Sequence, residues 1–102
     1  MNVSLIEPAY FELKDAIEYY NQEISGLGDN FYKELLSTIS LIKKFPQACT
    51  NNSYHTRKIV LKIFPYKIIY TIWNKEIYII AIAHQHREPD YWIERMNEFN
   101  WR

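Results

Sequence analysis

The second half of the chain is the feature that most restricts its fold. Three segments rich in isoleucine, valine and tyrosine follow one another over residues 58–64, 66–73 and 76–83. β-Branched and aromatic residues favour extended strands. The links between these segments are so short that neighbouring strands are expected to pair as hairpins. This half therefore predicts an antiparallel three-stranded meander.

The two links predict which side chains share a face of that sheet. Asn74-Lys75 suits a two-residue turn, and Pro65-Tyr66 suits another because proline presets the first turn position. On this register one face is apolar and needs a helical cover; it holds Ile59, Leu61, Ile63, Ile68, Tyr70, Ile72, Ile77, Ile79 and Ala81. The opposite face holds Lys58, Val60, Lys62, Phe64, Lys67, Ile69, Thr71, Trp73, Tyr78, Ile80 and Ile82, with His84 one step further.

The first half has helical periodicity. Residues 2–6 suit a short strand, and two apolar stripes at helical spacing follow, from Leu13 to Ile24 and from Phe31 to Ile42. The short link between them favours an antiparallel helix hairpin. We therefore predict a single α+β domain over residues 1–102, in which a short N-terminal strand precedes a helix hairpin packed on one face of an antiparallel sheet. The element order is β-α-α-β-β-β with a short C-terminal helix, which Trp92 and Phe99 would pack back onto the domain.

The charges are balanced overall but unevenly spread. Residues 1–40 hold seven acidic side chains against two lysines, whereas residues 41–75 hold seven basic side chains and no acidic one. Such asymmetry can give a neutral protein a basic face. The net charge of zero argues against a strong nucleic-acid binder, which is normally basic overall.

The compartment is predicted from what the sequence lacks. Cys49 is the single cysteine, so no internal disulfide can form, which is typical of a reducing cytoplasm. No apolar segment reaches the roughly 18 residues of a membrane span, and the start of the chain lacks signal-peptide features. We expect a cytoplasmic protein with no membrane association and no cofactor.

The segment "AHQHREPDYW", residues 83–92, directly follows the last predicted strand. It gathers two histidines, an arginine and two aromatic residues within ten positions. This composition fits a functional rim at the end of a sheet. It fits equally well a junction between a strand and a helix whose polar side chains are incidental.

Across nearly its whole length the chain resembles the RelE/ParE superfamily of toxins from bacterial type II toxin–antitoxin systems. The resemblance rests on "EYYNQEISGLGDNFYKELLSTISLIKKFPQA" (18–48), "FPYKIIYTI" (64–72) and "AHQHREPDYW" (83–92), in that order. The helix-hairpin segment and the FPY and PDYW segments look more ParE-like than RelE-like. The resemblance implies a toxin that inhibits growth and is neutralised by a cognate antitoxin in a hetero-oligomer, with a role in plasmid stabilization.

The two branches of the superfamily imply different targets. A ParE-like toxin would poison DNA gyrase without being an enzyme. A RelE-like toxin would be a ribosome-dependent mRNA endoribonuclease, with Arg87, Tyr91 and His84 as catalytic candidates. The third alternative is a non-catalytic member of the same fold that only binds a protein partner. Whether the chain is an enzyme therefore stays open at this point.

The residues themselves suggest how RNA would be bound and cleaved. A histidine such as His84 or His86 could move protons near neutral pH, and Arg87 could hold a phosphate in bidentate fashion. Lys58, Lys62 and Lys67 could neutralise phosphate, while Trp73 or Tyr91 could stack on a base. The same side chains are just as typical of an ordinary solvated strand face. His84-x-His86 lacks a well-spaced third ligand, so no metal site is predicted.

Overall fold

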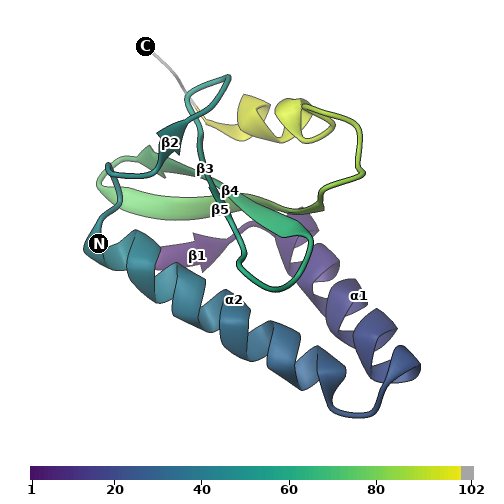
Figure 1. Ribbon diagram of the computed structural model, residues 1–102. Helices are drawn as coiled ribbons and strands as arrows, with labels where there is room; N and C mark the ends of the chain where they lie inside the picture. The colour runs from purple at the N-terminus through teal and green to yellow at the C-terminus, as the bar shows by residue number, and fades with distance from the viewer. Residues whose placement is uncertain (100–102) are drawn as a thin grey trace.

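The computed structural model describes residues 1–99, in which two helices pack on one face of a five-stranded sheet (Figure 1). The order is β1 (Val3–Leu5), α1 (Glu7–Glu23), α2 (Leu27–Lys44), β2 (Thr50–Asn51), β3 (Arg57–Val60), β4 (Tyr66–Trp73), β5 (Glu76–His84) and a 3-10 helix, η1 (Ile93–Glu98). The strands are arranged β1-β5-β4-β3-β2. The predicted α+β order is confirmed, and β2 is an addition in a segment expected to be a loop.

Strand β1 joins the sheet at one edge and runs parallel to β5. Val3 pairs with Ile77 and Leu5 with Ile79, and the N–H of Ile6 donates to the Ile79 carbonyl. The sheet is therefore mixed, with an antiparallel meander at its centre. Because β1 ends there, it leaves the outer edge of β5 beyond Ile79 without a neighbouring strand.

The helix hairpin depends on its two glycines. Gly26 has a left-handed φ of 88° and lies directly before α2, a conformation that glycine adopts without strain. At Gly28 a Cβ atom would lie 2.2 Å from the Ile17 carbonyl oxygen, so only glycine permits this close approach of the helices. The Gly28 N–H on α2 donates to Asn21 Oδ1 on α1 at 2.8 Å, and this hydrogen bond links the two helices directly.

The link between β3 and β4 differs from the prediction. Strand β3 ends at Val60, which pairs with Lys67, so the two-residue turn at Pro65-Tyr66 was wrong. The Glu34 carboxylate on α2 accepts hydrogen bonds from the N–H groups of Lys62, Ile63 and Phe64. These amides are satisfied outside the sheet, which allows the chain to leave the strand early.

This loop changes where its side chains lie. Lys62 is exposed on the loop rather than on a strand face, and Ile63 is 81% exposed instead of packing under the helices. Phe64 turns the other way, into the helix-side core, where it meets the rings of Tyr20 and Phe31.

The hairpin between β4 and β5 begins as predicted and is then interrupted by a bulge. Trp73 pairs with Glu76 around a turn in which Asn74 and Lys75 both have positive φ, as a tight hairpin requires. Further along, Ile69 pairs with Ala81 but Tyr70 pairs with Ile79, so Ile80 is an extra residue in β5.

A bulge of this kind shifts the alternation of side chains beyond it. Ala81 therefore packs beside Ile80 on the face away from the helices. Ile82 packs in the helix-side core, and His84 follows it to that side. The faces predicted for Ala81, Ile82 and His84 were wrong for this reason.

The helices cover one face of the sheet and the C-terminal segment lies over the other (Figure 1), and each face has its own hydrophobic core. On one face α1 and α2 pack against β4 and β5, with Phe31, Leu35 and Ile42 fully buried. On the opposite face the C-terminal segment brings Trp92 and Met96 onto Ile69, Ile80 and Ala81. The predicted return of Trp92 onto the domain is confirmed, since its side chain is only 1% exposed. The lysine-bearing face is therefore partly covered.

Candidate functional site

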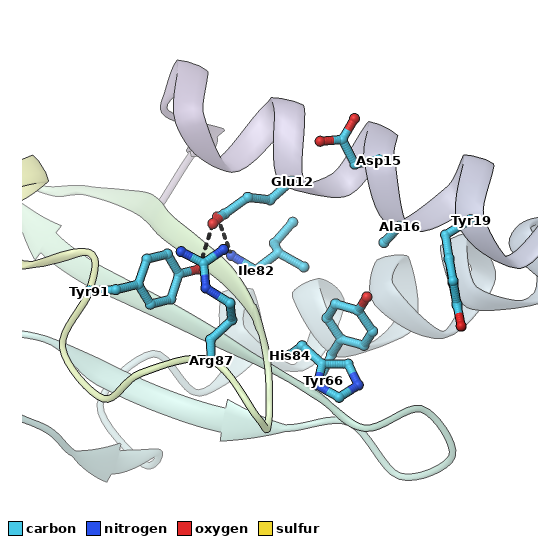
Figure 2. A pocket seen from close by; sticks show the side chains of 9 residues that line it. All are labelled: Glu12, Asp15, Ala16, Tyr19, Tyr66, Ile82, His84, Arg87 and Tyr91. Carbon is cyan, nitrogen blue, oxygen red and sulfur yellow. Dashed lines mark hydrogen bonds between the residues drawn. The ribbon is translucent and has the colours of Figure 1, made fainter.

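A cavity of about 310 Å³ opens where α1 passes the end of β5 (Figure 2). It brings together three predicted candidates, His84, Arg87 and Tyr91. The bulge in β5 is what directs His84 toward this cavity. The complete lining is Glu12, Asp15, Ala16, Tyr19, Tyr66, Ile82, His84, Arg87 and Tyr91.

The carboxylate of Glu12 joins the elements around the cavity. It accepts hydrogen bonds from the Ile82 N–H at 3.1 Å and from the Tyr91 hydroxyl. Arg95 on η1 binds it in bidentate fashion, with Nη1–Oε1 and Nη2–Oε2 distances of 2.9 and 3.0 Å. The side chains of Arg95 and Glu12 are only 19% and 17% exposed. Bidentate contacts of this kind are among the stronger hydrogen bonds in proteins.

The same ion pair completes the sheet edge that β1 leaves open. Glu12 binds the Ile82 N–H, while Arg95 Nη1 donates to the Ile80 carbonyl at 2.9 Å. Two backbone groups of β5 beyond the end of β1 thus find side-chain partners. Burial acts to lower the pKa of Arg95, but its hydrogen bonds to Glu12 and the negative charge of Glu12 outweigh burial and raise that pKa above its usual value.

Tyr91 forms a platform for Arg87. The Arg87 guanidinium carbon lies 3.8 Å from the centre of the Tyr91 ring, within the range of a cation–π contact (Figure 2). Burial raises the pKa of the Tyr91 hydroxyl, and its hydrogen bond to Glu12 raises it further. The phenol therefore stays protonated near neutral pH and is engaged as a donor. Arg87 itself is exposed and has no carboxylate partner among residues 1–99.

His84 lies between Tyr66 and His86. Its ring centre is 5.1 Å from that of Tyr66 in an edge-on contact, and 5.2 Å from that of His86. The His86 N–H donates to His84 Nδ1 at 3.1 Å, so a neutral His84 carries its proton on Nε2 and presents a donor there. Burial, followed by the nearby tyrosines Tyr20 and Tyr19, raises the pKa of Tyr66 to about 12.

The structure separates the predicted lysines from this cavity. Lys58 pairs with Ile69, and Lys67 pairs with Ala83, so both lie on the face opposite the helices. Lys62 lies on the β3–β4 loop and shares a face with neither. Lys58 and Lys67 thus lie on the sheet face predicted for them, but the prediction that Lys62 and His84 share that face was wrong.

Trp73 and His86 occupy different surroundings. Trp73 is at the far end of β4 from Tyr66 and packs edge-on against Tyr78 and Phe99, which places it in an aromatic cluster rather than at the cavity. His86 is exposed at the rim beside His84. Over residues 1–99 no group of three or more histidine, cysteine or acidic side chains is placed to hold a metal ion.

Sequence reasoning missed Glu12 and Arg95. Glu12 stands among several acidic residues of α1 that read as a solvated face, and its partner lies 83 residues away. The helical spacing of Glu12 beside buried Ala9 and Ala16 was the available signal that it faces inward.

No helix in the described part of the chain is long and apolar enough to cross a bilayer.

The fold is shared with solved toxin structures. A chain of the chromosomal ParDE system from P. aeruginosa aligns with a TM-score of 0.63 and 18% identity, covering 82% of this chain and 95% of that one. The isolated E. coli RelE toxin aligns with a TM-score of 0.63 and 14% identity, covering 96% and 98%. A sequence comparison with curated proteins gives no significant match. The chain therefore shares its fold with both of these toxins.

The sequence itself narrows this class. Residues 5–89 match the family described as ParE toxin of type II toxin-antitoxin system, parDE. The chain belongs to this family and is a ParE/RelE-like toxin of a type II toxin–antitoxin system. Membership implies an antitoxin as its partner.

Proposed function

We propose that this toxin arrests bacterial growth by binding DNA gyrase in the cytoplasm, and that a cognate antitoxin releases the arrest by forming a hetero-oligomer with it. Such a pair would also stabilise a plasmid that carried both genes. The family match to ParE toxins favours this target over messenger RNA. Gyrase poisoning is a binding activity, so it needs a shaped and charged surface rather than an acid–base pair.

One observation carries the choice of target. RNA cleavage needs proton-transferring groups and cations gathered at one phosphate. Here the sheet lies between His84, on the helix side, and Lys58 and Lys67, on the other side. The Tyr91 hydroxyl is occupied by Glu12 as well. The lysines expected to neutralise phosphate in a nuclease are therefore separated from the catalytic candidate His84.

The proposed contact surface is the rim formed by Arg87 and His86 with the ring of Tyr91 below. Arg87 presents an exposed guanidinium on an aromatic platform. Arginine on such a platform is well suited to bind carboxylates, phosphates and planar groups of a macromolecular partner.

A second candidate function is ribosome-dependent cleavage of mRNA. The observation in its favour is that the β5 bulge brings His84 into the same cavity as Arg87. In that case His84 would transfer the proton and Arg87 would hold the phosphate.

The two functions are separated by parallel assays of the purified toxin. We expect inhibition of gyrase supercoiling, with intact messages in a translation reaction. Arg87→Ala should weaken the gyrase inhibition. Messages cut at discrete sites, together with unaffected gyrase, would reject the proposal in favour of the nuclease.

A further inference from the structure

We infer that Glu12 is a positioning residue of this toxin: it fixes the Tyr91 ring and, through that ring, holds Arg87 where the target is contacted. The inference rests on the proposed function in one respect, which is that Arg87 contacts the target. Glu12 itself lies under the site and is largely buried.

Glu12 fixes the position of Tyr91 rather than merely touching it. Its Oε2 accepts both the Tyr91 hydroxyl and Arg95 Nη2, and its Oε1 accepts the Ile82 N–H and Arg95 Nη1. Four donors from three segments leave the carboxylate a single orientation. The Tyr91 hydroxyl is therefore held at a defined point between α1 and β5.

The orientation of the Arg87 side chain depends on Tyr91. Arg87 lies in the exposed loop after β5, and its guanidinium stacks on the Tyr91 ring at 3.8 Å from the ring centre. Within residues 1–99 Glu12 forms its ion pair with Arg95, and no carboxylate there pairs with the Arg87 guanidinium. A long side chain with one contact loses its orientation when that contact moves.

The positioning role of Glu12 is distinct from simple stabilisation of the fold. The two arginines near Tyr91 have different duties: Arg95 neutralises Glu12 and binds the Ile80 carbonyl, whereas Arg87 does neither. Loss of the Glu12 charge would therefore affect target binding through Arg87. A purely structural role would lower the amount of folded toxin by the same factor whether or not Arg87 is present.

The test is a double-mutant cycle between Glu12→Gln and Arg87→Ala, with growth-arrest potency measured at titrated expression. Gln keeps the shape and one acceptor but removes the charge. We expect Glu12→Gln alone to lower potency about tenfold, the size expected for loss of a hydrogen bond to a charged group. In the Arg87→Ala background it should cause no further loss. Tyr91→Phe should behave like Glu12→Gln.

Glu18→Gln is the matched control, because Glu18 is an exposed carboxylate on the same helix outside the cavity. It should leave potency unchanged. Losses from Glu12→Gln and Arg87→Ala that multiply independently would overturn the inference and leave Glu12 a structural role.

A second readout does not depend on any target. In NMR spectra the side-chain protons of Arg87 should be shifted upfield by the Tyr91 ring, and Glu12→Gln should move them toward their free values while Glu18→Gln should not. An unchanged Arg87 shift in folded Glu12→Gln protein would also overturn the inference. If gyrase is unaffected by the wild type but the growth-arrest cycle and the shifts behave as expected, the proposed target fails and the role of Glu12 stands.

Discussion

The Tyr91 hydroxyl donates a hydrogen bond to the Glu12 carboxylate and so joins residues 79 positions apart in the sequence. Arg95 binds the same carboxylate from η1. The C-terminal segment is thus attached to α1 by side-chain contacts across the end of β5. Both the stability of this segment and the shape of the cavity depend on that attachment.

Arg95→Ala should destabilise the fold far more than Arg87→Ala, although both arginines approach the Tyr91 ring. The first change leaves the Glu12 charge and the Ile80 carbonyl without their partner. We expect a loss of about 2 kcal/mol, somewhat below that of a fully buried ion pair because both side chains keep some exposure. Arg87→Ala should cost less than about 1 kcal/mol, the usual worth of an exposed cation–π contact. Urea unfolding at pH 7 measures both, and equal losses would contradict the role of Arg95.

Glu34→Ala should loosen the β3–β4 loop. Its carboxylate accepts from three consecutive backbone N–H groups, those of Lys62, Ile63 and Phe64. We expect a loss of about 2 kcal/mol in the free energy of unfolding, typical of hydrogen bonds to a charged group. Hydrogen exchange at these three amides should become faster. Glu18→Ala is the control, and the same change in stability there would show that Glu34 has no special role.

The loop and the bulge mark the limit of prediction from this sequence. The helices and the β4–β5 hairpin follow from local patterns: apolar spacing, the two glycines of the helix link and the Asn74-Lys75 turn. The early end of β3 depends instead on Glu34, which lies 28 residues before Lys62. A prediction based on alternation has no means of including such a contact.

The candidate site was predictable only where its residues lie close together in the sequence. His84, Arg87 and Tyr91 stand close together in the sequence and share a cavity in the structure. His84 was placed on the wrong face because one extra residue in β5, Ile80, reverses the faces beyond it. Lys62 was misplaced because β3 ends at Val60. Glu12 was missed because its partners come from the other end of the chain.

The free energy of unfolding should begin to fall near pH 10, because buried tyrosines keep their protons in the folded state. Burial and neighbouring tyrosines raise the pKa of Tyr66 from 10.0 to about 12 in the folded state. Burial also raises the pKa values of Tyr70 and Tyr91. A raised pKa means that the folded state keeps a proton that the unfolded state has already lost. The contribution of protonated Tyr66 to the stability of the folded state is therefore complete below about pH 10, and it declines as the pH rises toward 12.

Unfolding by urea at pH 8, 10 and 11 measures this decline. Tyr66→Phe removes one of the titrating groups, so its stability should fall less steeply with pH than that of the wild type. Parallel curves for the two proteins would show that Tyr66 does not contribute to the alkaline loss.

The antitoxin is expected to lie on the sheet face that carries Lys58 and Lys67. These lysines lie on neighbouring strands, and neither forms an ion pair with an acidic side chain within residues 1–99. An acidic antitoxin segment that folds as it binds would be attracted to them.

The double variant Lys58→Glu with Lys67→Glu should weaken antitoxin binding by on the order of 2 kcal/mol or more at low salt. Circular dichroism should first show that this variant is folded. Lys62→Glu is the matched control, because Lys62 lies on the loop away from this face. The wild-type affinity should also fall as salt rises, since salt screens such pairs. Unchanged affinity of the double variant at low salt would place the antitoxin elsewhere, with the acidic helix hairpin as the next surface to test.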